Sequence, residues 1–424
     1  MNHPMKPASI YKFLLPVLFF FIPFCSHALG VLTHEAIVDA AWDKTILPLL
    51  KQKYPGASAE EIKDAHAYAY GGAVAPDMGY YPRGNKLFTN LVHYVRSGDM
   101  VMALLKNANN LNQYAFAMGF LSHYHADNYG HPLATNRCVP LVYPKLQKKY
   151  GSYITYAQNE ISHMRMEFGF DVLEVAKGNY ASQAYRNFIG FKVDTTVLAK
   201  AFLETYGINI NELYKNHLSR SVETFRWIVA NVFPLITRQA WAAKKNSILQ
   251  KDSTATAARF NYKMRQRIYN KEYGRGYKQP GFFPTLLSFF IRVLPKVGPL
   301  KALKFKAPTT EAEKYFAQSF DSIMHYYILD IKKQDSKNIT LQDIDFDTGK
   351  PTAPCEYSLA DDTYRQLLLK HKTDNFKNIS YPLQQNMLGF FKTADASGDN
   401  IKASKKCAVF YRALNDLKAM QVVK

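Results

Sequence analysis

The sequence predicts an all-α fold. Apolar residues recur at three- and four-residue spacing through most of the first 245 residues, which is the period of a helix with one buried face. No segment shows the alternation of apolar and polar side chains that is typical of a half-buried strand, and no internal repeat is present. The chain has 424 residues, 47% of them hydrophobic, so it can bury a large core and is not of the mainly disordered class.

The helical pattern is clearest in the segments 34–53, 58–70, 112–125, 153–177 and 219–244. In the second segment Ser58 is followed three residues later by Glu61, a capping box that starts a helix. The stretch GGAVAPDMGYYP that follows at 71–82 indicates a loop, and we expect this loop to present Asp77.

The first 28 residues have the pattern of a secretory signal peptide. Lys6 and Lys12 give a positive start, a short apolar core follows at 13–24, and Ser26 and Ala28 are the small residues before a cleavage site. The core is too short to span a bilayer comfortably. We therefore expect cleavage after Ala28 and a mature protein that is periplasmic, on the cell surface or secreted.

Changes of composition divide the chain into a signal peptide (1–28), a catalytic domain (29–245), a basic and aromatic-rich segment (246–310) and a mainly helical C-terminal region of unknown role (311–424). Residues 273–310 contain seven Lys or Arg and no acidic residue. Such a segment can lie in a membrane interface, or it can pack on the catalytic domain with its lysines in water.

The net charge of the chain is strongly positive. It is +20 at pH 7, and loss of residues 1–28, which contain Lys6 and Lys12 but no acidic residue, leaves +18. This charge favours polyanionic partners and does not choose between anionic lipid and nucleic acid.

Two histidine–carboxylate pairs in the first half of the chain have metal-ligand spacing. His123 and Asp127 form HxxxD, and His163 and Glu167 form HxxxE. Residues four apart on a helix share a face, so each pair can direct an imidazole and a carboxylate at one point. These two groups suit zinc. A single pair of this kind is also common on helix surfaces and does not by itself indicate a metal site.

Further residues extend the two pairs. His131 lies four residues beyond Asp127, Asp77 lies in the expected loop, His93 has the apolar context LVHYV, and His34 begins the first mature helix. These five histidines and three carboxylates are enough for more than one metal ion if the fold brings them together. No CxxC spacing, glycine-rich phosphate loop or nucleophile elbow offers a different chemistry.

In residue type and order, this set resembles the zinc-dependent phospholipase C family and the related secreted zinc-dependent single-strand nucleases. The resemblance covers residues 29–175 and implies a helical domain around a multinuclear site of three zinc ions. It implies that the ligands are Leu29, His34, Asp77, His93, His123, Asp127, His131, His163 and Glu167.

The resemblance also implies how these ligands are shared. The first zinc would bind Asp77, His93, His123 and Asp127, the second Leu29, His34 and a bridging Asp127, and the third His131, His163 and Glu167. Paired metal ions stabilise both oxygens in a displacement at phosphorus, and zinc lowers the pKa of bound water toward about 7. By the same resemblance, Asp77 is the catalytic residue that orients this water or accepts its proton.

The N-terminal spacing supports the resemblance. In the nuclease branch, the first mature residue binds zinc through its amino nitrogen and carbonyl oxygen, five positions before the first histidine ligand. Cleavage after Ala28 places Leu29 five positions before His34. An α-amino group has a pKa of about 8, so it can deprotonate and bind zinc near neutral pH. The family usually has Trp here, and Leu29 keeps the backbone ligands without the indole.

One spacing departs from the family pattern. The gap from Asp127 to the next histidine ligand is six residues in better-known members and four here. His131 is the candidate, because Pro132 disturbs the turn there. His125 is the alternative, although on a helix it points about 200° away from His123.

These residues predict an exported zinc-dependent hydrolase of phosphoric diesters. The leading hypothesis is a phospholipase C that cleaves the glycerol–phosphate bond of phospholipids, with a phospholipid or membrane surface as its partner. The first alternative is a secreted nuclease that acts on single-stranded DNA or RNA. The second is a non-catalytic helical protein with structural zinc, for which closed four-coordinate sites are expected. No motif indicates a protein partner.

Overall fold

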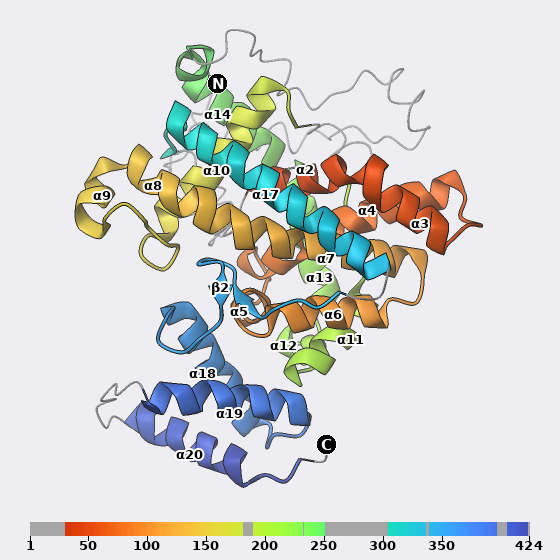
Figure 1. Cartoon of the computed structure of the whole chain (residues 1–424), viewed down its shortest axis with the longest axis vertical. Coiled ribbons are helices and arrows are strands. Elements are labelled where there is room, and N and C mark those ends of the chain that lie inside the picture. Colours follow the sequence, from red (N-terminus) through yellow and green to blue (C-terminus); the bar gives the residue numbers. More distant parts are fainter. Residues whose placement is uncertain are drawn as a thin grey trace, which may run out of the picture.

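The computed structural model describes residues 30–180, 190–231, 233–250, 304–335, 339–396 and 405–422. Most of the described residues are helical and only two short strands are present among them, which confirms the all-α class (Figure 1). The expected signal peptide, Leu29 and most of the basic segment 246–310 lie outside them. No helix among the described residues is both long and apolar enough to cross a lipid bilayer.

The elements up to residue 250 are α2 (Val31–Ala41), η1 (Trp42–Ile46), α3 (Leu47–Lys53), α4 (Ala59–Val74), η2 (Ala75–Tyr80), α5 (Lys86–Tyr94), α6 (Ser97–Asn107), α7 (Leu111–Gly130), η3 (His131–Thr135), α8 (Asn136–Val142), α9 (Pro144–Tyr150), α10 (Glu160–Lys177), α11 (Thr195–Tyr206), α12 (Ile210–Leu213), α13 (Leu218–Asn231) and α14 (Phe233–Leu249). The later elements are α17 (Thr310–Asp335), β1 (Ile344–Asp345), β2 (Lys350–Pro351), α18 (Ser358–Thr373), α19 (Tyr381–Ala396) and α20 (Lys405–Ala419).

Helix α7 lies at the centre of the fold. It is buried along nearly its whole length, because α2, α4, α6 and α17 pack around it (Figure 1). The contact with α4 depends on two glycines. A Cβ on Gly119 would lie 1.9 Å from the Ala69 carbonyl oxygen, and a Cβ on Gly72 would lie 2.0 Å from that of Phe116. The two helix backbones therefore touch, as glycine alone permits.

This packing corrects the expected loop at residues 71–82. Helix α4 runs on through Gly71 and Gly72 to Val74, and Asp77 lies in the short 3-10 helix η2. The glycines allow close helix packing here and do not form a turn. The predicted start of α4 is confirmed, because the Ser58 side chain accepts a hydrogen bond from the Glu61 amide while the Glu61 carboxylate accepts one from the Ser58 amide.

Two other expected helices differ from the prediction. The helix expected over 153–177 begins only at Glu160, because the Asn159 side chain caps it by accepting a hydrogen bond from the Ser162 amide. The helix expected over 34–53 is divided by the π-helical turn η1. The sequence also did not predict a strand, whereas β1 and β2 form a short antiparallel ribbon with Ile344 opposite Pro351. Two-residue strands are too short for an alternating pattern to show.

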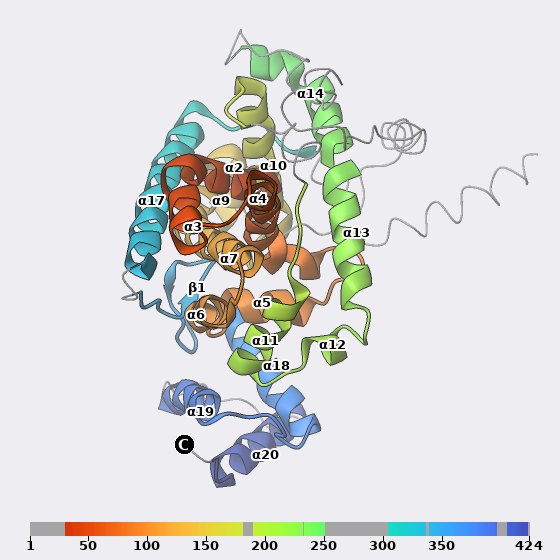
Figure 2. The same cartoon turned by 90° about the vertical axis from the view of Figure 1, so that its right-hand side faces the viewer.

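The region after residue 304 lies in two places. Helix α17 packs along α7, whereas α18, α19 and α20 lie together at the lower end of the molecule (Figures 1 and 2). Helix α18 contacts α5, and the His371 ring donates a hydrogen bond from Nε2 to the Tyr206 carbonyl at 2.8 Å. The ribbon lies between these two parts of the chain and reaches the centre of the helical body.

Candidate metal centre

The eight side chains expected to bind metal lie together in one buried cluster. They come from six elements: His34 from α2, Asp77 from η2, His93 from α5, His123 and Asp127 from α7, His131 from η3, and His163 and Glu167 from α10. Each is at most 2% exposed. Leu29, the ninth expected ligand, lies outside the described residues.

Asp127 is the centre of the cluster. The distances from its carboxylate oxygens to histidine Nε2 atoms are 3.2 Å for His123, 3.5 Å for His93, 3.6 Å for His34 and 3.7 Å for His131. The two oxygens face different histidines: Oδ1 faces His34 and His131, and Oδ2 faces His93 and His123. A carboxylate with imidazoles on both sides is suitably placed to bridge two cations.

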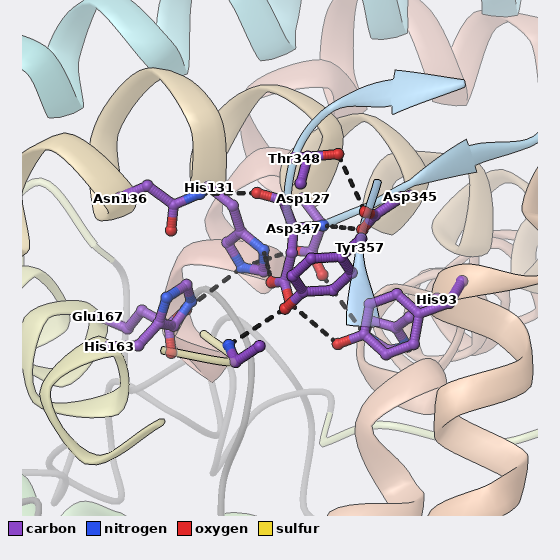
Figure 3. A network of polar contacts seen from close by, with 12 residues as sticks. His93, Asp127, His131, Asn136, His163, Glu167, Asp345, Asp347, Thr348 and Tyr357 are labelled. Carbon is purple, nitrogen blue, oxygen red and sulfur yellow. Dashed lines mark hydrogen bonds and ion pairs between the residues drawn. The ribbon is translucent and has the colours of Figure 1, made fainter. Parts of the chain in front are cut away.

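The other two carboxylates lie on either side of Asp127. Asp77 has its Oδ1 atom 3.3 Å from His93 Nε2 and its Oδ2 atom 3.9 Å from His34 Nε2. At the opposite end, Glu167 Oε1 lies 2.8 Å from His163 Nε2 and 3.3 Å from His131 Nε2 (Figure 3). The cluster therefore extends from η2 to α10 with a carboxylate at each end and one in the middle.

His131 enters this cluster and His125 does not. His131 is the first residue of the π-helical turn η3, which contains Pro132 and widens the end of α7. The His125 ring points to another side of α7, where its Nε2 atom lies 3.2 Å from Asp330 on α17. The helical angle that separates His125 from His123 thus has the consequence expected from the sequence.

Backbone carbonyls determine which nitrogen of two imidazoles carries the proton. His123 Nδ1 lies 2.8 Å from the Ala73 carbonyl oxygen, and His93 Nδ1 lies 2.8 Å from that of Thr89. A carbonyl only accepts, so Nδ1 is the donor in both rings and Nε2 of the neutral ring carries a lone pair. These two Nε2 atoms are 3.3 Å apart and face carboxylates. Such an arrangement is repulsive unless a metal ion or an additional proton lies between the groups.

Several buried polar atoms of the cluster make no hydrogen bond. These atoms include both nitrogens of His34 and both carboxylate oxygens of Asp77 and of Asp127. Buried polar groups normally have partners, and a set without them at one place indicates an ion. Two groups of residues, His34 with His123 and Asp127, and Asp77 with His93 and His123, have ligand atoms within 4.8 Å of one another. Imidazole nitrogens and carboxylate oxygens at such separations fit zinc.

In the metal-free cluster, protons and metal ions compete for the same ligand atoms, and the pKa values of the histidines reflect this competition. Burial and the neighbouring His123 hold the pKa of His34 well below its usual range, so this ring is neutral and able to bind metal. Burial alone would lower the pKa of His93, but Asp127 and Asp77 outweigh it and raise the pKa to about 9. A proton on His93 then neutralises the carboxylates in place of a metal ion, and metal binding must release it.

The carboxylates differ from one another. Burial raises the pKa of Asp77, and the nearby His123 and His93 offset only part of this rise. Burial also opposes ionisation of Asp127, but the charges of His123 and His131 outweigh it and hold the pKa of Asp127 well below its usual range. Asp127 is therefore the permanent anion of the cluster, whereas Asp77 takes up a proton more readily.

The structure adds a residue that the sequence did not indicate. Asp347, in the turn between β1 and β2, has its Oδ1 atom 3.0 Å from His131 Nδ1 (Figure 3). Its neighbour Phe346 is fully buried against the rings of His93 and His123, with centroid distances of 5.2 and 5.9 Å. Asp347 has no histidine three or four residues away, so it does not form a histidine–carboxylate pair of the kind that identified the other residues.

The comparison with known protein families agrees with this geometry. The family model described as zinc dependent phospholipase C matches residues 33–216, a segment that contains all eight clustered side chains. No curated protein and no solved structure matches the chain. Residues 33–216 therefore match the zinc-dependent phospholipase C family, and this match supports a hydrolase activity.

Proposed function

We propose that this protein is an exported phospholipase C that binds up to three zinc ions and hydrolyses the glycerol–phosphate bond of phospholipids. The observation that carries the proposal is the buried cluster of five imidazoles and three carboxylates inside the segment that matches the family. Zinc bound there would supply Lewis-acid stabilisation of negative charge on phosphoryl oxygens.

The residues of the cluster suit different tasks in this reaction. Asp127, which stays ionised, would hold two cations close together between its two oxygens. Asp77 lies at one end of the cluster, beside His93 and His34, where it would orient the attacking water or accept its proton. His163 and Glu167 lie on the far side of Asp127 and would hold the third ion, with His131 between.

The proposed amino-terminal ligand is supported by the anchoring of the residues that follow it. The amides of Leu32 and Thr33 donate hydrogen bonds to the Asp171 carboxylate at 3.2 and 3.1 Å. Asp171 lies on α10, one helical turn beyond the predicted ligand Glu167. The first turn of α2 is therefore tied to a helix of the cluster, within a few residues of Leu29.

The expected partner is a phospholipid surface, and the expected location is outside the cytoplasm. The signal-peptide pattern at residues 1–28 supports export, and the charge of +20 supports attraction to an anionic membrane. The description of the matching family favours a phospholipid over a nucleic acid as the substrate.

The test uses the processed protein with zinc and phosphatidylcholine vesicles, and it measures released phosphorylated head group. His123→Ala should lower the rate at least about 100-fold, since even the outer partners of metal ligands are worth 10–100-fold. His125→Ala is the matched control. It removes a buried histidine two residues away, and Asp330 keeps Lys333 as a partner at 2.8 Å, so the rate should stay near that of the wild type.

Single-stranded DNA and RNA are tested at the same enzyme concentration. Lipid turnover that depends on His123 supports the proposal. No head group released above the His123→Ala background refutes the phospholipase activity, and cleavage of the nucleic acids in that case makes the protein a nuclease.

A further inference from the structure

The turn that carries Asp347 is rigid. Asp345 accepts hydrogen bonds from the Asp347 amide at 2.9 Å and from the Thr348 hydroxyl at 3.0 Å (Figure 3). Gly349 has a φ of +69°, which favours glycine, and a Cβ there would lie 2.6 Å from the Asn128 carbonyl oxygen. The turn is thus preformed and lies directly against α7.

The ribbon is also fixed to the helices around the cluster. The Phe346 amide donates to the His93 carbonyl at 3.2 Å, and the Asn136 side chain donates to the Asp347 carbonyl at 2.7 Å. On its other side, the Ser97 hydroxyl donates to the Ile344 carbonyl at 2.7 Å. Contacts from α5, α6 and α8 therefore hold the ribbon in one place.

Both carboxylate oxygens of Asp347 are engaged. Oδ1 faces His131 Nδ1 at 3.0 Å, and Oδ2 accepts hydrogen bonds from the hydroxyls of Tyr94, at 3.1 Å, and Tyr357. The side chain is 3% exposed. A buried carboxylate with this number of donors is held in one orientation and is stable as an anion.

The His131 ring connects Asp347 to the cluster. Its Nδ1 atom faces Asp347, and its Nε2 atom faces Glu167 at 3.3 Å. A metal-binding imidazole commonly donates its other ring N–H to a carboxylate or carbonyl, which fixes the ring and makes it a better ligand. His93 and His123 have backbone carbonyls of the helical domain in this role. For His131 the partner is a side chain from beyond the segment 33–216 that matches the family.

We propose that Asp347 is a positioning residue of the metal centre, which holds His131 so that its Nε2 atom is directed at the ion shared with His163 and Glu167. The inference rests on the proposed zinc site and deepens it, because a residue from outside the matched segment 33–216 then completes the site. His131, His163 and Asp347 also have ligand atoms within 4.8 Å of one another. Direct binding of metal by Asp347 is less favourable, since both of its oxygens already have partners.

The experiment measures zinc content and zinc affinity, by competition with a chelator, on the full-length processed protein without lipid. Asp347→Ala should weaken one zinc by about 10–100-fold and leave the others unchanged. Asp347→Asn keeps an oxygen that accepts from His131 Nδ1 and should restore part of this affinity. Asp330→Asn is the matched control, because Asp330 pairs with His125, a buried histidine outside the cluster, and it should bind zinc like the wild type.

Two results would overturn the positioning role. One is an Asp347→Ala protein that binds every zinc within about twofold of the wild type, well below the 10–100-fold expected. The other is an equal and complete loss of one zinc in both Asp347 variants, which would make Asp347 a direct ligand. If Asp347→Ala does not fold, the Asp347→Asn protein decides the question. The positioning role is refuted if this protein has both the zinc affinity of the wild type and its pH dependence of zinc binding. A wild type that binds zinc but cleaves no phospholipid refutes the proposed function alone.

Discussion

Removal of zinc should destabilise the helical domain by a large and predictable amount. The eight clustered side chains lie between residues 34 and 167 and come from six elements, so an unfolded chain cannot assemble them. Zinc then binds only the folded state. At a free zinc concentration about 1,000 times the Kd, each independent site adds about 4.1 kcal/mol to the free energy of unfolding.

The effect on the melting temperature follows from the size of the domain. A change of 1 kcal/mol shifts the Tm of a 150–250-residue domain by roughly 2–4 °C. One occupied site therefore corresponds to about 8–16 °C, and three sites to several times that. Without zinc, the buried oxygens of Asp77 and Asp127 also lack hydrogen bonds, which adds to the difference.

Thermal unfolding followed by circular dichroism, in excess zinc and in excess chelator, measures this shift. In His163→Ala, the shift of the Tm should be smaller by roughly the contribution of one zinc site. His125→Ala should show the full shift. The reasoning is refuted if the Tm of the wild type is the same in zinc and in chelator, or if His163→Ala shows an undiminished shift.

Two further predictions concern parts of the fold outside the cluster. Gly119→Ala should lower the free energy of unfolding by about 1–3 kcal/mol or more, because its Cβ would lie 1.9 Å from the Ala69 carbonyl oxygen. Gly389→Ala in α19, whose Cβ would meet no atom within 4 Å, should instead raise the free energy of unfolding by about 0.5–1 kcal/mol. Urea unfolding measures both variants. Similar effects of the two substitutions would contradict the close contact of α4 with α7. Burial lowers the pKa of His371. Below about pH 6.5 the unfolded chain therefore binds a proton at this residue that the folded chain does not bind. The free energy of unfolding should fall as the pH decreases through that value. His371→Gln should show a weaker decrease in urea unfolding at several pH values, and an equal slope in both proteins would show that His371 keeps its ordinary pKa.

Local geometry explains what could be predicted from the sequence. The pairs His123 with Asp127 and His163 with Glu167 are recognisable because four residues of helix place two side chains on one face, whatever the rest of the chain does. The capping box at Ser58 is local in the same way. The order of the remaining histidines and carboxylates indicated the family, and the match to residues 33–216 confirms it.

Close packing of helices explains why the loop predicted at residues 71–82 was wrong. Gly71 and Gly72 predicted a loop, yet they lie inside α4, where the absence of a side chain lets another part of the chain approach the helix. A glycine pattern is the same for a turn and for a close helix contact. Only the position of the neighbouring backbone distinguishes the two.

The sequence by itself determined the all-α class, the chemical type of the site and most of its candidate residues, because these depend on composition and on spacing within single helices. Only the tertiary structure decided that the pairs from α7 and α10 meet around Asp127, that His131 and not His125 faces Glu167, and that Asp347 reaches His131. These are contacts between segments up to 216 residues apart in the sequence. The packing of α10 against η3, and of the ribbon against α5 and α6, creates them, and no local pattern encodes that packing.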